Sequence, residues 1–140
     1  MNILDTLFGV TPAYADAASI QPKGVAYTES RGMTPKAKLT PGKAGEIGTY
    51  QITPVAFQDL QRLMPKYRSM DFFKVASNDA TAKIAMQDYL GLMESHYAPH
   101  YGIKPTDENL LQMFNVGPKG FSQGKRNSEY VKTYKQGIGR

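Results

Sequence analysis

The residue types that this chain lacks narrow the chemistry it can perform. It contains no cysteine and only two histidines, His96 and His100. Disulfides, thiolate metal sites, iron–sulfur clusters and cysteine nucleophiles are therefore excluded. A zinc site needs a cluster of His, Cys or carboxylate ligands and is not expected. The two histidines lie four positions apart and are interpreted as a solvated pair, so we expect neither a metal nor another cofactor.

Carboxylates remain as the strong acid–base candidates, and Glu29 stands out among them by its context. It lies near the expected end of a short helix, between Tyr27 and Ser30 and just before a glycine-rich segment. The negative end of a helix dipole disfavours an ionised carboxylate, and an apolar wall would raise its pKa further. A glutamate kept protonated near neutral pH is the general acid that cleavage of a glycosidic bond requires. Because most isolated glutamates are simply solvated, this context alone does not assign a function.

The elements that would position Glu29 are mostly helices. Apolar residues at helical spacing predict helices over residues 21–31, 53–64, 79–97, 106–116 and 128–136, with a turn or short helix at 71–75. Thr53, Asn78 and Thr106 are suitable N-caps. Pro99 and Gly102 are expected to break the third helix, and Gly117 with Pro118 the fourth, before a loop over residues 119–128.

The segment after the first helix is expected to be irregular. Residues 32–48 hold four glycines and two prolines, which predicts a long loop. Long loops inside compact domains usually have a function. Residues 49–52 are expected to form a short strand or an extended turn. The fold class predicted is therefore mainly α, or α+β, with a long loop or a minimal β-hairpin near residues 32–52.

The length of 140 residues and the hydrophobic content of 41% are those of one globular domain. No apolar stretch approaches the ~18 residues of a spanning helix, so no transmembrane segment is expected. We place an N-terminal arm at residues 1–19 and the folded domain at 20–140. The step Ala13-Tyr14-Ala15 is similar to a signal-peptidase site, but no basic segment precedes it and Asp5 interrupts the apolar run. The arm is therefore interpreted as a docking element rather than an export signal.

The charge of the chain is positive and uneven. The net charge is +5, and residues 117–140 carry six lysines or arginines against Glu129 alone. A basic segment of this kind favours a polyanionic partner. Nucleic acid, an anionic membrane surface and an acidic cell-wall polymer all qualify on charge alone. Because no nucleic-acid-binding motif is recognisable, nucleic acid is not the expected partner.

Four short motifs follow one another along the chain. Residues 29–32 read Glu-Ser-Arg-Gly, 48–54 read Gly-Thr-Tyr-Gln-Ile-Thr-Pro, 113–118 read Met-Phe-Asn-Val-Gly-Pro and 129–131 read Glu-Tyr-Val. In order and approximate spacing they resemble the soluble lytic transglycosylase family, whose fold is related to goose-type lysozyme. The helix led by Asn78 and ending in Tyr89-Leu90 is similar to another element of that family. The resemblance covers the chain from about Gln21 to Tyr134.

This resemblance implies a lysozyme-like fold and a single catalytic carboxylate for the domain at residues 20–140. Glu29 would protonate the leaving glycosidic oxygen of a peptidoglycan strand and then act as base toward the C6 hydroxyl of the sugar. The product would be a 1,6-anhydro sugar, and one carboxylate can perform both proton transfers. The residues that the resemblance places around the substrate are Ser30, Tyr50, Gln51, Phe114, Asn115 and Tyr130.

The chain departs from the family pattern at two of these positions. The family's Leu-Met pair before the glutamine is Thr49-Tyr50 here, and the tyrosine before the asparagine is Phe114, which has no hydroxyl. If that hydroxyl helps to tune the acid, its role is either missing in this chain or taken by Tyr50 or Tyr130. These departures motivate an alternative in which the chain is a structural, wall-binding subunit that does not cleave.

A second carboxylate, Glu46, leaves a hydrolytic mechanism open. Glu46 lies in the long loop and, across a cleft from Glu29, it would act as base or stabilise the oxocarbenium ion, as in a hydrolytic lysozyme. A separation of about 5–5.5 Å between the two carboxyl groups would indicate retention, and about 6.5–9.5 Å inversion. Otherwise Glu46 is an exposed loop residue.

The expected setting is an assembly that crosses a cell wall. The glycan strands of peptidoglycan are the expected substrate. A short catalytic domain without a clear signal peptide is typical of a phage particle component that opens the wall for genome delivery, or of a secretion or conjugation system. Residues 1–19 or the basic C-terminal segment would dock to the other proteins of the assembly. The protein is accordingly expected in the virion, or delivered to the periplasm or cell wall.

Overall fold

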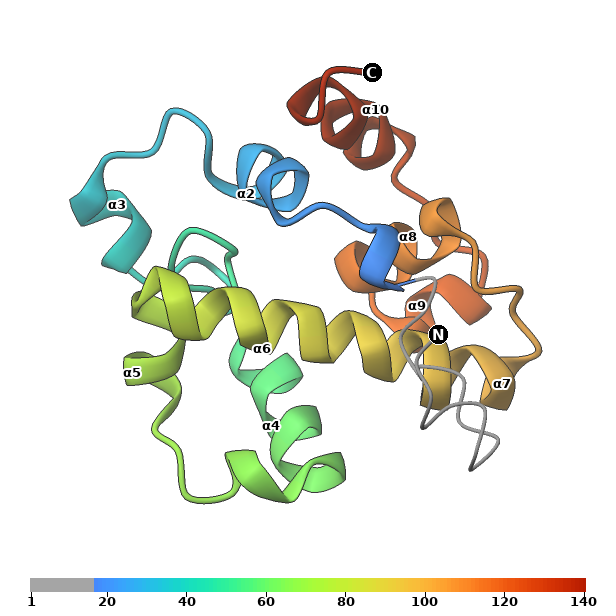
Figure 1. Cartoon of the computed structure of the whole chain (residues 1–140), viewed down its shortest axis with the longest axis horizontal. Coiled ribbons are helices and arrows are strands. Elements are labelled where there is room, and N and C mark those ends of the chain that lie inside the picture. Colours follow the sequence, from blue (N-terminus) through green and yellow to red (C-terminus); the bar gives the residue numbers. More distant parts are fainter. Residues whose placement is uncertain (1–16) are drawn as a thin grey trace, which may run out of the picture. The chain divides into compact units, whose positions relative to one another are not determined.

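The computed structural model describes residues 17–140, which are mainly α-helical (Figure 1). This part of the chain contains no β-strand, and the expected hairpin is reduced to one antiparallel bridge between Ile47 and Ile52. The 3-10 turns are η1 (Ala17–Ser19) and η2 (Pro65–Tyr67), and η3 (Met93–Tyr97) is a π-helical turn. The α-helices are α2 (Pro22–Ser30), α3 (Pro35–Leu39), α4 (Pro54–Leu63), α5 (Phe72–Ser77), α6 (Asp79–Leu92), α7 (Ala98–Tyr101), α8 (Asp107–Val116), α9 (Pro118–Ser122) and α10 (Ser128–Gly137).

The N-caps expected from the sequence are confirmed. The Thr53 hydroxyl accepts from the Ala56 amide at 3.1 Å, and the Thr106 hydroxyl accepts from the Asn109 amide at 3.2 Å. Asn78 Oδ1 accepts from the amides of Ala80 and Thr81 at 3.0 and 3.1 Å. Each cap satisfies amide groups that the first turn of a helix leaves without a partner, and α4, α6 and α8 begin where they were predicted.

Two helices occur where loops were expected. Residues 35–39 form α3 and residues 118–122 form α9. In both, a proline that was interpreted as a breaker occupies the first helical position, where its missing N–H costs nothing and its fixed φ suits the helix. Thr34 also caps α3 through a 3.1 Å bond from the Ala37 amide. The expectation of unbroken loops over 32–48 and 119–128 was therefore wrong.

The long helix does not break at Pro99 as expected. The chain passes from α6 through the π-helical turn η3 into α7 and ends at Gly102, whose φ of 66° is left-handed. Proline cannot donate the ordinary helical hydrogen bond, and its ring crowds the carbonyl four residues earlier. The wider η3 turn lies just before Pro99 and changes the hydrogen-bond register there. Only the break at Gly102 is confirmed.

The contacts of the chain group it into two compact units. Among the described residues, one comprises 17–21 and 90–132, and the other comprises 22–89 and 133–140. We call them the α8 unit and the α2 unit. The expected arm at residues 1–19 falls largely outside the described residues. Its last part, Ala17–Ser19, belongs to the α8 unit, where Ala17 and Ile20 are buried and Ser19 Oγ donates to Asp107 at 2.5 Å.

The α2 unit has an apolar core with aromatic residues at its centre. Phe57 on α4 meets the rings of Tyr67 and Phe72 edge to face, with centroids 5.9 and 5.6 Å apart. The Tyr67 hydroxyl donates to Asp88 at 2.5 Å, so its polar atom is satisfied although the ring is buried. These contacts join α4, η2 and α5 to α6. The largest fully buried side chains of this unit are Val25, Leu60, Met86 and Tyr134.

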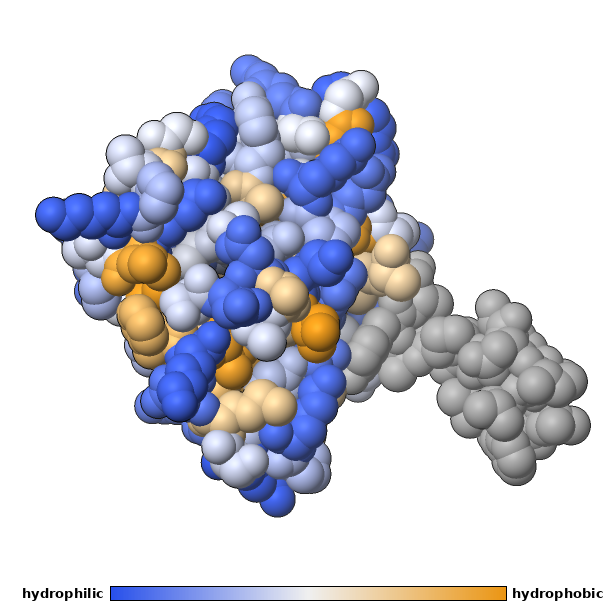
Figure 2. Space-filling view, turned by 60° about the vertical axis from the view of Figure 1, so that its left-hand side comes forward, coloured by the Kyte–Doolittle hydropathy of each residue, from blue (hydrophilic) through white to orange (hydrophobic). Residues whose placement is uncertain are grey.

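The surface is largely hydrophilic in the view of Figure 2, where apolar residues appear in small separate groups. Val55, Phe73 and Ile84 are the most exposed large apolar side chains, at 66%, 47% and 49%. Scattered apolar residues are normal on the surface of a globular protein. Within residues 17–140, no helix is both long and apolar enough to cross a membrane.

The close packing of α2 against α10 predicts that replacing Gly24 with alanine destabilises the protein. A Cβ at Gly24 would lie 2.5 Å from Tyr134 Cε1 and 2.6 Å from Ile138 Cγ2. Gly24→Ala should therefore destabilise the protein by about 1–3 kcal/mol through overpacking, although alanine is the better helix former. Thermal or denaturant unfolding measures the change.

Gly120 in α9 provides the matched control for this substitution. A Cβ there would lie 3.2 Å from Cδ of the flexible Lys125 side chain, so Gly120→Ala should leave the free energy of unfolding unchanged or raise it slightly. A Gly24→Ala protein as stable as Gly120→Ala would contradict the close approach of α2 and α10.

Candidate functional site

Glu29 lies at the position that the sequence analysis predicted, one residue before the end of α2. Its side chain is half-buried, and the helix stops after Ser30 because Gly32 turns the chain with a φ of 79°. Arg31 follows the helix, and its guanidinium lies 5.0 Å from the centre of the Tyr27 ring. Glu29 therefore lies in the last turn of α2, where a helix leaves backbone carbonyls without intrahelical partners.

Ser30 connects the helix of Glu29 to a turn further along the chain. Its side chain is 5% exposed, and its hydroxyl donates to the Thr49 carbonyl at 2.7 Å, with the Ala26 carbonyl at 3.2 Å as a second acceptor. The hydroxyl proton is thus used inside the α2 unit. Ser30 consequently acts as a residue that positions Glu29 relative to residues 47–52, which we call the 47–52 turn.

The 47–52 turn is tight and partly strained. Ile47 and Ile52 exchange two backbone hydrogen bonds of 3.1 Å across it. Gly48 has a φ of 90°, and a side chain there would overlap the Ala76 carbonyl of α5. Gln51 has a φ of 50°, the only positive value among the described non-glycine residues. Such a conformation costs on the order of 1–3 kcal/mol and is often found at functional sites.

The side chain of Gln51 leaves its carbonyl available. Its Nε2 donates to the Gly48 carbonyl at 2.7 Å, which holds the amide plane against the turn. Gln51 is half-buried, and Oε1 accepts no hydrogen bond from any residue in the described part of the chain. An acceptor held in this way suits an N–H group of a ligand, such as that of an N-acetyl sugar.

Tyr50 is buried in the same turn and faces the charge of Asp79. Its side chain is 7% exposed. Burial, and secondarily the negative charge of Asp79, raises the pKa of the Tyr50 hydroxyl above its ordinary value of 10.0. Tyr50 therefore remains a protonated hydrogen-bond donor over the whole physiological range.

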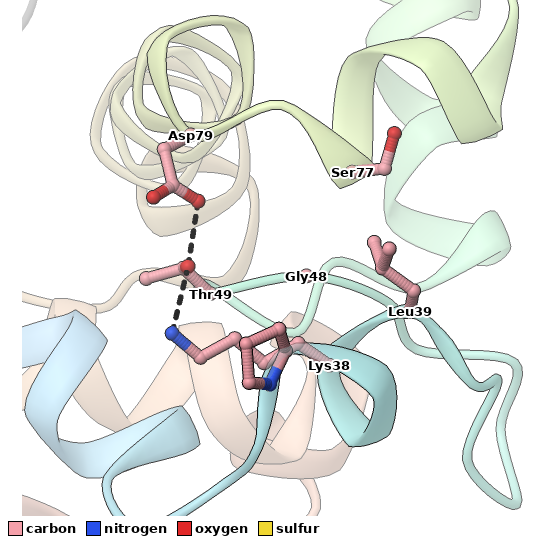
Figure 3. Close-up of a pocket in the computed structure, with 7 residues that line it drawn as sticks. Lys38, Leu39, Gly48, Thr49, Ser77 and Asp79 are labelled. Atoms are coloured by element: carbon pink, nitrogen blue, oxygen red, sulfur yellow. Dashed lines mark hydrogen bonds between the residues drawn. The ribbon is translucent and has the colours of Figure 1, made fainter.

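Thr49 brings in two residues that the sequence analysis did not select, Lys38 and Asp79. The Thr49 hydroxyl donates to Asp79 Oδ1 at 2.6 Å and receives a 3.4 Å bond from Lys38 Nζ. Lys38 lies on α3 and Asp79 begins α6, so three segments meet at one hydroxyl (Figure 3). Only the N-cap at Asn78 pointed to the position of Asp79. The position of Lys38 depended on α3, which was not expected.

Glu46 lies over its own loop. Its side chain folds across Gly42, where a Cβ would overlap the carboxylate, and the Gly42 amide donates to the Glu46 carbonyl at 3.1 Å. Within residues 17–140 the Glu46 carboxylate has no hydrogen bond or ion pair. This geometry explains the glycine at position 42. The catalytic role that the sequence analysis left open for Glu46 stays a prediction.

The other three predicted residues belong to the α8 unit. Asn115 is exposed on α8, and its Oδ1 accepts from Asn127 Nδ2 at 2.9 Å. Asn127 also receives a 3.3 Å bond from the Tyr130 amide, and its own amide donates to Gln112 Oε1 at 2.7 Å. Asn127 therefore orients Asn115 and caps α10, a role that its place before the last helix indicates in the sequence. Phe114 is half-buried, and Tyr130 is buried at 5% exposure.

At least one cation of the basic C-terminal segment, Arg126, is engaged within the protein instead of being free for a partner. The Arg126 guanidinium lies 3.5 Å from the centre of the Phe121 ring and donates to the Phe121 carbonyl at 2.8 Å. This cation–π contact uses Arg126 inside the α8 unit. His96 and His100 are both exposed, and no group of three potential metal ligands occurs in residues 17–140.

Removing the Ser30 hydroxyl should destabilise the protein more than removing the Thr28 hydroxyl. Ser30→Ala deletes the donor to the Thr49 carbonyl, at a cost of about 1–3 kcal/mol for the unsatisfied buried group. Thr28 donates only to Gly24 of its own helix, at 2.7 Å. Thr28→Ala should leave the free energy of unfolding nearly unchanged, because alanine is the better helix former. Equal unfolding free energies for the two variants would contradict the link.

The raised pKa of Tyr50 predicts a loss of stability at high pH. Because the pKa in the folded state exceeds that in the unfolded state, the contribution is complete below pH ~10 and is lost as the pH rises through the folded value. The unfolding free energy of the wild type should therefore fall more steeply above pH ~10 than that of Tyr50→Phe. Denaturant titrations at several pH values measure both, and parallel curves would contradict the burial of this hydroxyl.

Comparison with known proteins supplies no relative of this chain. No family model, no curated protein and no solved structure matches it.

Proposed function

We propose that this protein is a lytic transglycosylase that cleaves peptidoglycan, with Glu29 as its single general acid and base. The observation that supports this best is the bond from Ser30 to the Thr49 carbonyl. It ties the end of α2, with its half-buried glutamate, to a strained turn that carries Tyr50 and Gln51. These residues belong to the motifs on which the resemblance rests, and two of those motifs meet at this bond.

In the proposed reaction one carboxyl group transfers protons twice. Protonated Glu29 donates its proton to the glycosidic oxygen between N-acetylmuramic acid and N-acetylglucosamine, and the C1–O bond breaks. The resulting Glu29 carboxylate then takes the proton of the C6 hydroxyl as that oxygen attacks C1. A 1,6-anhydro ring forms, no water is consumed, and Glu29 regains its proton.

The surrounding residues have supporting roles in this proposal. The free carbonyl of Gln51 accepts the N–H of an N-acetyl group, and the protonated Tyr50 forms the inner wall of the turn. Ser30 and Thr49 hold the acid in place. For Phe114, Asn115 and Tyr130, substrate binding remains what the resemblance implies. The exposed amide nitrogen of Asn115 suits that role, because Asn127 already binds its oxygen.

The proposed setting is local opening of a cell wall by a phage particle or by a secretion or conjugation system. The protein would reach the wall in the virion or be delivered to the periplasm, and residues 1–19 or the basic C-terminal segment would dock it to the assembly. In the latter, lysines rather than Arg126 would make the contacts, since Arg126 is held by Phe121.

Glu29→Gln tests the assignment of the acid. The variant keeps the shape of the side chain but cannot donate the catalytic proton, so release of fragments from purified peptidoglycan should fall by at least a thousandfold, on the order of the loss of a general acid. The melting temperature should stay close to that of the wild type. Glu46→Gln is the matched control and should retain cleavage.

Other outcomes of this experiment favour the alternatives. Loss of cleavage in both Glu29→Gln and Glu46→Gln would favour a hydrolytic lysozyme with two carboxylates. Tight binding of the wild type to cell walls with no released fragments would favour a non-catalytic wall-binding subunit. An active Glu29→Gln protein would refute the acid assignment.

A further inference from the structure

A pocket of about 250 Å³ lies on the α2 unit, and Thr49 is one of the residues that line it (Figure 3). Three segments form its walls. Lys38 and Leu39 come from α3, Gly48 and Thr49 from the 47–52 turn, and Ser77 and Asp79 from the junction of α5 and α6. The catalytic roles proposed above use the Thr49 carbonyl but assign no function to the side chains that line this pocket.

One cation and one anion border this pocket without forming a salt bridge with each other. Lys38 Nζ and Asp79 Oδ1 bind the same Thr49 hydroxyl, at 3.4 and 2.6 Å. Salt bridges elsewhere in the described part of the chain include Arg62 with Asp59 and Lys66 with Asp88. The Thr49 hydroxyl thus separates the two charges and holds both at the pocket wall. Asp79 Oδ2 and two protons of the Lys38 ammonium remain available for a ligand.

This arrangement selects against ligands of a single charge. An anion attracted by Lys38 would be repelled by Asp79, and a cation attracted by Asp79 would be repelled by Lys38. A group that carries both charges a short distance apart satisfies both residues at once. The α-ammonium and α-carboxylate of an amino acid are such a group, because a single carbon joins them.

The rest of the pocket suits the remainder of an amino acid. Leu39 is 44% exposed and provides an apolar wall for an aliphatic side chain. The Ser77 hydroxyl has no hydrogen-bond partner among the described residues and can bind a carboxylate oxygen. Gly48 permits the close approach of the turn to Ala76, and that approach brings α3 and the α5–α6 junction around one cavity.

From these observations we infer that the pocket binds the zwitterionic head of an amino acid, with the carboxylate at Lys38 and the ammonium at Asp79. Two sources have this chemistry, a free amino acid and the peptide attached to a wall glycan. The second rests on the proposed function. It is favoured by Thr49, which borders the pocket with its hydroxyl and holds the helix of Glu29 through its carbonyl.

Binding is tested with 2,6-diaminopimelate, which carries an ammonium and a carboxylate on one carbon at each end. Backbone amide signals of Leu39, Gly48 and Thr49 should shift saturably in NMR titrations. The doubly N-acetylated compound lacks both ammonium groups, and the dimethyl ester lacks both carboxylates. Each should bind at least tenfold more weakly. Equal shifts with all three compounds, or none with diaminopimelate, would overturn the inference.

Variants of the two charged residues provide the second arm. Lys38→Met and Asp79→Asn should each weaken binding of diaminopimelate at least tenfold. Lys36→Met is the matched control, because Lys36 is exposed on the same helix and does not line the pocket. Unchanged affinity in both pocket variants would contradict the assignment. The same titration with Glu29→Gln should give wild-type affinity, so binding is measured independently of cleavage.

Competition distinguishes the two sources. If a wall peptide occupies the pocket, diaminopimelate should raise the KM of the wild type for intact peptidoglycan. It should leave unchanged the KM for glycan strands from which the peptides have been removed. Saturable binding without any effect on either KM would assign the pocket to a free amino acid and refute the link to the wall peptide.

Discussion

The hydrogen bond from the buried Ser30 hydroxyl to the Thr49 carbonyl is the constraint on which the account of the α2 unit depends. The Thr49 carbonyl lies in a partly buried part of the 47–52 turn, and a buried carbonyl without a donor is costly. Ser30, the residue that follows Glu29, supplies that donor. The position of the acid is thereby coupled to the conformation of the 47–52 turn.

Thr49 extends this coupling to a second set of residues. While its carbonyl accepts from Ser30, its hydroxyl bridges Lys38 and Asp79. Asp79 in turn contributes to the raised pKa of Tyr50. The turn can remain strained at Gln51 because it is held on both sides, by α2 and by the α3–α6 contacts. Thr49, which borders the pocket with Lys38 and Asp79, is thus also the residue that binds Ser30 beside Glu29.

Much of the helical framework could be predicted from the sequence, and the misses have physical causes. Thr53, Asn78 and Thr106 are confirmed as N-caps because capping depends on local residues. Pro35, Pro99 and Pro118 were interpreted as breakers, but two of them begin helices and one follows a π-helical turn. Proline is equally compatible with a break and a start, and the choice depends on the residues before it.

In the candidate site, too, some features could be predicted from the sequence and others could not. The position of Glu29 near a helix end followed from the sequence, whereas the burial of Tyr50 did not. The roles of Lys38, Asp79 and Asn127 did not, because each depends on contacts between segments distant in the sequence. Glu46 could be identified from the sequence as a loop carboxylate, but its position across Gly42 could not.

The central claim, that one carboxylate cleaves the glycan without water, is tested most directly by digesting peptidoglycan in water labelled with heavy oxygen. Transglycosylation takes the new C1 oxygen from the sugar's own C6 hydroxyl. If Glu29 acts in this way, the released fragments end in 1,6-anhydro rings and contain no label. Fragments with labelled reducing ends would contradict it and indicate hydrolysis.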